Sequence, residues 1–227
     1  MTRRTNARIA GFTFLFYIAV AFSGMVLSNR AASGEGTGAK LTSIAQHAPD
    51  VRVAVLLELL GCFSALVLAV TLYSITRDQD PDLAMLAMTC RVAEGVIGAV
   101  SLPREVGKLW LATAAGADAP DPAAASALAA VLLKLPGSAL LGATFFAVGS
   151  TLFAYLLLRG RIVPVALAWL GILSSLLIML SLPLQFVGFL HGPLTDLMWF
   201  PMLAFELTFA LWLIIKGAAM PARRQSA

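Results

Sequence analysis

The chain alternates between six long apolar stretches and short polar or charged segments. Each stretch is long enough to be a transmembrane helix, because about 20 mostly apolar residues cross the hydrocarbon core of a bilayer. We therefore predict an all-α, polytopic integral membrane protein in which residues 1–227 form a single six-helix bundle. The predicted spans are residues 9–28, 51–75, 83–102, 136–158, 164–187 and 197–215.

The composition agrees with this pattern. Apolar residues make up 59% of the 227 residues and charged residues 12%, whereas a soluble domain has about 25% charged residues. The mean hydropathy of +0.88 points the same way. Cys62 and Cys90 both fall inside predicted spans. We therefore expect buried thiols that pack as small apolar side chains, and no disulfide.

Three segments leave alternatives open. The first span follows a short basic segment, as a signal peptide does, but its apolar run exceeds the roughly 7–15 residues typical of such a peptide. We therefore expect an uncleaved helix. Pro103 is expected to bend or end the third span, and residues 104–125 to form an extracytoplasmic amphipathic segment and linker. The fourth span begins near Ala127 or near Pro136.

Small side chains recur at helical spacing in two of the spans. This spacing predicts faces that pack closely against other helices. The same faces are also compatible with a homodimer or a partner membrane protein. The positions are Ala10, Tyr17, Ala21, Gly24 and Ser28 in the first span and Ser138, Gly142, Phe145 and Gly149 in the fourth.

The connecting segments differ in charge on the two sides of the membrane. With six spans both termini lie on one side, which carries nine basic residues and three acids, a net charge of +6. The other side carries six of each, a net charge of zero. Basic residues favour the cytoplasmic side, so we predict cytoplasmic termini in a bacterial inner membrane. The sequence pI near 9.4 then reflects topology, and we expect no nucleic-acid partner.

The residues behind this count are as follows. The terminal side holds Arg3, Arg4, Arg8, Arg77, Arg159, Arg161, Lys216, Arg223 and Arg224 with Asp78, Asp80 and Asp82, and the opposite side holds Arg30, Lys40, Arg52, Arg104, Lys108 and Lys134 with Glu35, Asp50, Glu105, Asp118, Asp121 and Asp196.

Four charged residues fall inside the predicted spans. Arg91 and Glu94 lie three residues apart in the third span, on the helix face that also carries Gly95 and Gly98, so we expect all four to face one neighbouring helix. The other two charged residues are Glu58 in the second span and Glu206 in the sixth.

These four residues form a candidate ligand-binding or proton-handling site. Fully ionised, they would leave the membrane interior with a net charge of −2. A charge at the bilayer centre costs about 2.5–3.5 kcal/mol on insertion scales. We therefore expect that some carboxyl groups are protonated, or that water or a cation reaches them. Residue counting places Glu94 and Glu206 near the middle of the membrane, Glu58 a little nearer the outer face and Arg91 about one turn nearer the cytoplasm than Glu94. One cluster is therefore geometrically allowed. A purely structural clamp between the helices is the alternative interpretation.

Other residues give weaker signals for chemistry. His47 and His191 fall in loops without the surrounding pattern of a metal or haem site, and His191 shares its short loop with Asp196. The sequence contains no Gly-x-Ser-x-Gly, His-Glu-x-x-His or phosphate-binding glycine motif. We therefore predict no cofactor and no metal, and we lean against an enzyme without excluding one.

Several short sequences across the chain carry a resemblance to one family. They are Ala7-Arg8-Ile9-Ala10-Gly11, Arg91-Val-Ala-Glu94, Phe145-Phe146, Tyr155-Leu-Leu-Leu-Arg159 with Pro164, and Glu206-Leu-Thr-Phe-Ala-Leu-Trp212-Leu-Ile-Ile-Lys216-Gly217.

Together they resemble the bacterial membrane proteins grouped as domain of unknown function 4386. The resemblance covers nearly the whole chain. It departs from the family pattern after Pro164, where no basic residue follows directly. The resemblance implies a six-helix integral membrane protein and implies no activity.

Three hypotheses for function follow. The first is a non-enzymatic protein that binds or translocates a small or lipid-like ligand around Arg91, Glu94, Glu206 and Glu58. The second is an intramembrane or interfacial enzyme acting on lipid through His191 and Asp196. The third is a structural or subunit role with inert charge clamps. Membrane lipid is the expected partner in each case.

Overall fold

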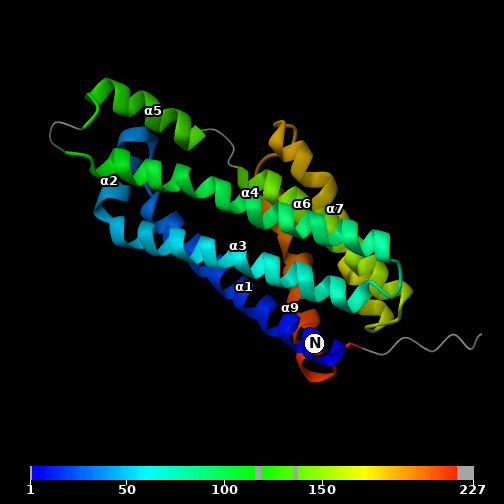
Figure 1. The fold of residues 1–227 in the computed structure, drawn as a ribbon. Coiled ribbons are helices and arrows are strands. Elements are labelled where there is room, and N and C mark those ends of the chain that lie inside the picture. Colours follow the sequence, from blue (N-terminus) through cyan, green and yellow to red (C-terminus); the bar gives the residue numbers. More distant parts are fainter. Residues whose placement is uncertain (1, 116–118, 135–137, 219–227) are drawn as a thin grey trace, which may run out of the picture.

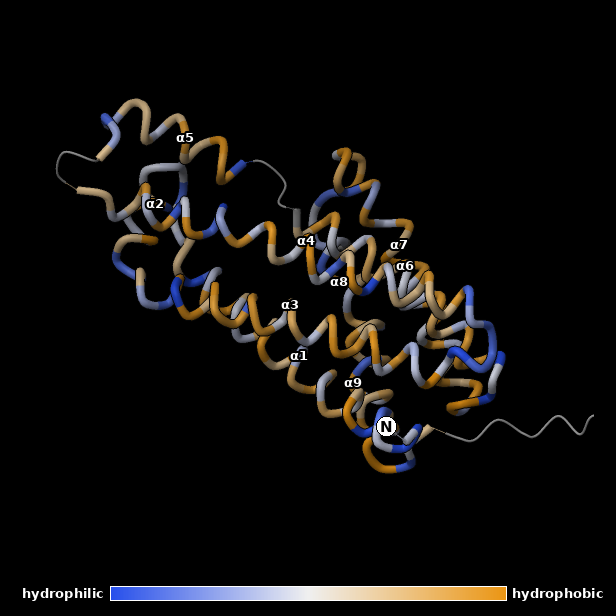
Figure 2. Tube along the Cα trace, viewed as in Figure 1, coloured by the Kyte–Doolittle hydropathy of each residue, from blue (hydrophilic) through white to orange (hydrophobic). Residues whose placement is uncertain are grey.

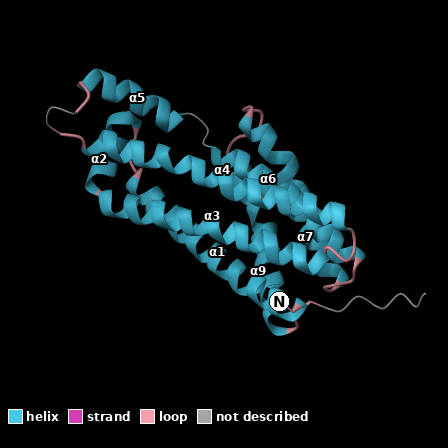
Figure 3. Cartoon of the chain, in the orientation of Figure 1, coloured by secondary structure: helices cyan, strands magenta, loops and turns pink. Residues whose placement is uncertain are grey.

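The computed structural model describes residues 2–115, 119–134 and 138–218, and all regular secondary structure in these ranges is helical (Figure 3). Within these ranges six helical segments are long and apolar enough to cross a membrane, the fourth including α5 and α6 and the sixth including α8 and α9. The predicted fold class is therefore confirmed. The long helices are α1 (Arg3–Ala31), α3 (Ala48–Thr76), α4 (Pro81–Thr113), α6 (Ser138–Arg159), α7 (Val165–Phe186) and α9 (Trp199–Ile215), and the short ones are α2 (Gly36–Gln46), α5 (Pro122–Lys134) and α8 (Leu194–Leu197).

The six long helices form a closed ring. Going round it, α1 contacts α3, α3 contacts α4, α4 contacts α6, α6 contacts α7, α7 contacts α9, and α9 returns to α1 (Figure 1). The predicted first span is thus an integral part of the bundle. Most of the buried apolar side chains belong to one core inside this ring. The outer surface also carries many large apolar side chains, such as Phe12, Phe63 and Leu180, as a surface facing lipid requires.

Ion pairs join the turns at one end of the ring, which we call the terminal end. Arg3 at the start of α1 lies 3.3 Å from Asp78 in the α3–α4 turn. Arg159 at the end of α6 lies 3.0 Å from Asp80 in the same turn. Gly217, just after α9, packs near Arg4. Both ends of the described chain therefore lie at this end, as six spans require. The predicted contributions of Arg223 and Arg224 lie outside the described residues.

A smaller cap lies over the ends of α1, α3 and α4 at the opposite end of the bundle, which we call the cap end. It consists of α2, α5 and the part of α4 that follows Pro103 (Figure 1). A second apolar core, made by Ala31, Ile44, Val51 and Leu109, joins α2 to the ends of α1, α3 and α4. At about 1.5 Å per residue, the 33 residues of α4 extend roughly 50 Å, which exceeds the roughly 30 Å hydrocarbon core.

The structure changes one expectation at this end. Helix α4 does not end at Pro103 but continues to Thr113, so residues 104–113 extend the third span. Arg104 donates hydrogen bonds to the carbonyl of Leu132 near the end of α5, which ties α5 to this extension. The predicted segment also includes residues 116–118, with Asp118, and the predicted fourth span begins at Pro136; both positions lie outside the described residues.

Polar residues gather at the two ends of the bundle. In Figure 2 apolar segments run along the middles of the long helices, whereas the turns at the terminal end and parts of the cap are hydrophilic. Helix starts use local caps: Thr2 accepts from the N–H of Thr5, and Asp80 from that of Leu83. Such side chains satisfy N–H groups that a helix leaves unpaired.

Glycine allows the closest helix contacts. A Cβ added at Gly95 of α4 would lie 2.9 Å from the carbonyl oxygen of Cys62 in α3. One added at Gly149 of α6 would lie 3.0 Å from the carbonyl oxygen of Ala87 in α4. Gly142, also on α6, would make only an ordinary contact of 3.5 Å. The small-residue face of the fourth span therefore packs on α4.

We predict that Gly95→Ala destabilises the bundle and that Gly142→Ala does not. Overpacking costs about 1–3 kcal/mol, whereas replacing a helical glycine by alanine gains about 1 kcal/mol. Only the Gly95 substitution pushes a methyl group against backbone. Thermal unfolding of both variants in lipid nanodiscs measures the difference, and equal melting temperatures would contradict the close contact between α3 and α4.

Candidate intramembrane site

Arg91 lies inside the ring and is only 1% exposed. Its guanidinium carbon lies 4.8 Å from the ring centre of Phe146, 5.7 Å from that of Tyr17 and 6.0 Å from that of Phe14. Phe146 belongs to α6, which neighbours α4. Tyr17 and Phe14 belong to α1, which neighbours α3. Aromatic faces attract cations, most strongly where water is excluded. The three rings thus supply part of the stabilisation that water would give Arg91.

Glu94 is the direct ionic partner of Arg91. Arg91 Nη1 lies 2.9 Å from Glu94 Oε2, and the hydroxyl of Tyr17 donates a 2.8 Å hydrogen bond to Glu94 Oε1. The Arg91–Glu94 contact is close but not aligned as a hydrogen bond, and the guanidinium nitrogens have no hydrogen-bond partner among the described residues. Close pairing offsets much of the cost of burying two charges, although hydrogen bonds would be needed to complete it.

Glu206 brings a second carboxyl group to the same place. It lies midway along α9, is 6% exposed, and lies within the electrostatic reach of both Arg91 and Glu94. Its Oε1 atom is buried and has no hydrogen-bond partner among the described residues. One arginine therefore faces two buried carboxyl groups.

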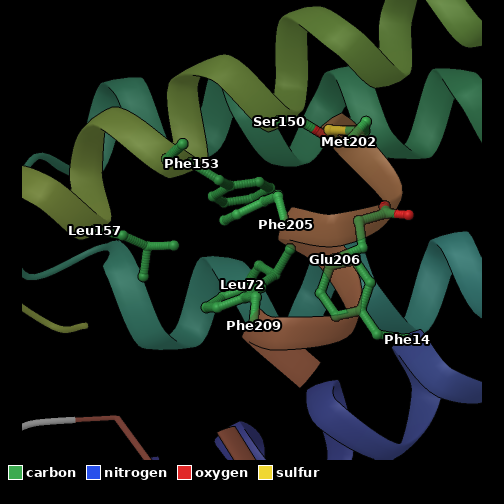
Figure 4. A pocket seen from close by; sticks show the side chains of 10 residues that line it. Phe14, Leu72, Ser150, Phe153, Leu157, Met202, Phe205, Glu206 and Phe209 are labelled. Carbon is green, nitrogen blue, oxygen red and sulfur yellow. The ribbon is translucent and has the colours of Figure 1, made fainter. Parts of the chain in front are cut away.

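A small cavity adjoins Glu206. The centre of a water molecule can occupy a volume of about 10 Å³ in this cavity. This is room for about one water molecule. Figure 4 shows the Glu206 side chain between Met202 and Phe14, with the rings of Phe205 and Phe209 lining the same pocket. Ser150 is the other residue with a polar side chain in this lining.

Glu58 does not join this cluster. It is half-buried on α3, where its Oε1 accepts a 3.0 Å hydrogen bond from Ser101 of α4. The charged residues that act on it are Glu105 and Lys108, nearer the cap end. The structure thus gathers Arg91, Glu94 and Glu206 and leaves Glu58 in separate surroundings.

The glycines of the third span face a different neighbour from the charged pair. Gly95 and Gly98 pack against Cys62 of α3, whereas Arg91 and Glu94 meet aromatic residues of α1 and α6. The expectation that all four share one neighbouring helix is therefore wrong. The reason is that each residue turns the helix by about 100°, so Glu94 and Gly95 point about 100° apart and the four positions spread over a sector of α4 that meets more than one neighbouring helix.

Sequence reasoning missed Tyr17 as a member of the site. Its position in the small-residue face of the first span was the available signal, because that face turns toward other helices. A tyrosine there brings a hydroxyl group into an apolar interior, and buried hydroxyl groups normally find a partner. Phe14 and Phe146 gave no signal beyond ordinary core packing.

The loop residues show no organised site. His191 and Asp196 are both exposed, and no hydrogen bond between them is found in the described part of the chain. His47 contacts the carbonyl oxygen of Ser43 through Nδ1, at 3.0 Å, where α2 meets α3. Within residues 2–115, 119–134 and 138–218, no group of three or more His, Cys, Asp or Glu side chains is placed to hold a metal ion.

Fold and site together define a polytopic α-helical membrane protein with a buried Arg–Glu cluster. The family model described as domain of unknown function 4386 matches residues 9–217, and the chain belongs to this family. No curated protein and no solved structure matches it.

We predict that Tyr17→Phe destabilises the protein by roughly 1–2 kcal/mol. A hydrogen bond to a charged group contributes about 1.5–3 kcal/mol in soluble proteins, but hydrogen bonds between transmembrane helices average about 0.6 and reach about 1.7 kcal/mol. Reversible unfolding in mixed micelles measures the change. Tyr155→Phe is the matched control, because Tyr155 is 44% exposed and makes no hydrogen bond through its hydroxyl. Equal effects of the two substitutions would remove Tyr17 from the site.

Proposed function

We propose that this protein is a non-enzymatic membrane protein whose Arg91–Glu94–Glu206 cluster takes up and releases a proton. The observation that carries the proposal is the unequal number of charges: two buried carboxyl groups face one guanidinium group. Arginine stays protonated in proteins, so it balances one carboxylate. The second carboxylate requires a proton, a cation or water to be stable in this interior.

Available space favours the proton among these. The cavity beside Glu206 has room for about one water molecule, and Arg91 disfavours a second cation next to it. A proton needs no space of its own. Tyr17 also holds one oxygen of Glu94 in place, so Glu206, with its unpartnered oxygen, is the group to which we assign the exchangeable proton.

Binding or translocation of a small or lipid-like ligand is a further part of the proposal. Such a ligand is larger than the cavity, so it requires the ring of helices to open next to the cluster. Protonation of Glu206 would then change the charge that the ligand meets. A structural clamp, in which the cluster only joins α1, α4 and α9, is the competing function.

We expect the wild-type protein to show an infrared carbonyl absorption from a protonated carboxyl group that changes with pH. Glu206→Gln should remove this change while keeping most of the stability, because the amide replaces a neutral group of similar shape. The measurement is a pH-difference infrared spectrum of the protein in lipid, across the pH range in which it stays folded.

Glu35→Gln is the control, because Glu35 is an exposed acid just before α2 and its loss should leave the buried signal unchanged. Glu94→Gln should lower the stability, since it removes the direct partner of Arg91. A buried carboxyl signal that never changes with pH, with Glu206→Gln and Glu94→Gln destabilised to a similar extent, would support the structural clamp and eliminate proton exchange.

We also propose that both termini are cytoplasmic and that the membrane is the bacterial inner membrane. The support is the excess of basic residues at the terminal end, where Arg3 and Arg159 pair with Asp78 and Asp80 and other basic residues remain. We expect a reporter that works only in the cytoplasm to be active when it is fused after Gly217. A reporter that works only outside the cytoplasm should be active when it is inserted at Gly38. The reverse pattern would invert the orientation.

A further inference from the structure

A line of polar side chains leads along α4 from the cluster toward the cap end. Glu94, Ser101, Glu105 and Lys108 follow one another at intervals of seven, four and three residues, which keeps them on one side of a helix. The rise along this line is about 10 Å from Glu94 to Ser101 and about 10 Å more to Lys108. Because α4 continues unbroken past Pro103, the line reaches the cap.

Helix α3 faces this line with groups that can also carry protons. Glu58 accepts a hydrogen bond from Ser101, and Cys62, one turn deeper, packs against Gly98. The Cys62 thiol is within electrostatic range of both Glu58 and Glu94. The boundary between α3 and α4 thus holds Glu58, a thiol and a hydroxyl group, and Glu94 lies beside its inner end.

The cap end of this boundary is partly exposed. Lys108 Nζ lies 2.7 Å from Glu105 Oε1, and both side chains are partly exposed. Glu58 itself is only half-buried. A proton from the surface therefore meets first the Lys108–Glu105 pair and then Glu58.

The terminal half of the ring offers no comparable line. From the cluster to the turns at the terminal end, the six spans contain no Asp, Glu or His, as residues 9–17, 63–76, 83–90, 146–158, 165–182 and 207–215 show. The interior there is filled by buried apolar side chains such as Leu72, Leu157 and Phe209. Protons crossing this half would meet no group that titrates near neutral pH.

We propose that the α3–α4 boundary is the path by which protons reach the cluster, and that Glu58 is its intermediate carrier. This inference rests on the proposed function. Glu58 takes a proton from water at the cap end. It passes that proton to a cluster carboxylate through water molecules that enter when the close contact between Gly98 and Cys62 loosens, and it becomes a carboxylate again. The same steps in reverse return the proton, so no net charge is left in the path.

The test measures how fast the cluster carboxyl group exchanges its proton for deuterium. Protein in lipid is diluted into D₂O, and the shift of the carboxyl infrared band assigned through Glu206→Gln is followed in time. We expect Glu58→Gln to slow this exchange by about tenfold or more, because it removes a positioned proton carrier. Glu58→Asp should restore much of the rate, and the position of the pH-dependent change at equilibrium should stay the same.

Glu35→Gln serves as the control and should leave the rate unchanged. An unchanged rate in Glu58→Gln, with exchange still present, would overturn the path but leave the proposed function standing. An absence of any exchangeable carboxyl group in the wild-type protein would instead overturn the proposed function.

A second measurement follows the two thiols of the wild-type protein. The S–H absorption of Cys62 should convert to S–D along with the cluster exchange, whereas that of buried Cys90, which lies against α6, should convert more slowly. The variants Cys62→Ala and Cys90→Ala assign the two bands. If Cys62 keeps its S–H absorption while the cluster carboxyl group exchanges, water does not reach the α3–α4 boundary and the proposed path is wrong.

Discussion

The structure depends on keeping one guanidinium group stable at the centre of an apolar ring. Arg91 is enclosed by α1, α4 and α6, with Glu94 as its ionic partner and three aromatic rings around it. Removing one partner of a buried pair costs about 3–5 kcal/mol, because the other charge is left uncompensated. The positions of Tyr17 and Glu206 therefore matter as much as those of the charged pair, since both adjust the charge and hydrogen bonding that Arg91 and Glu94 experience.

The closed ring makes this burial feasible. Membrane helices gain little from hydrophobic association, since lipid is as apolar as their side chains, so close packing and polar contacts hold them together. Gly95 and Gly149 bring α3 and α6 directly against α4 on either side of the charged pair. This approach leaves little empty volume and keeps lipid and bulk water from the cluster. The ring and the cluster thus stabilise each other: the glycines let the helices close, and the charges join α1, α4 and α9.

The sequence predicts the fold well because apolar length and charge counting act locally. It predicts Arg91 and Glu94 as a pair because three-residue spacing fixes their proximity within one helix. It cannot predict Glu58 in the same way. Counting residues estimates depth, but the direction of a side chain depends on how its helix is rotated in the ring. Glu58 lies ten residues before Leu68, whose side chain is in the core, so the two side chains point about 80° apart around α3. Glu58 is therefore directed to Ser101 of α4 and not into the core. The continuation of α4 through Pro103 depends on the packing of the cap, and local helix propensity gives no information on such packing.

The two halves of the bundle differ in a way that bears on mechanism. Between the cluster and the terminal end the spans carry only neutral side chains, and the hydroxyl groups there largely bond to carbonyls of their own helices, as Thr71, Thr76 and Ser175 do. On the cap side, carboxyl groups recur at intervals of about 10 Å or less along the rise of α3 and α4. A charge buried at the boundary between such halves communicates with one side only. A membrane protein that exchanges a proton without letting protons leak across the bilayer must not connect its site to both sides at once, and this asymmetry fits that requirement, whereas an inert clamp has no need of it.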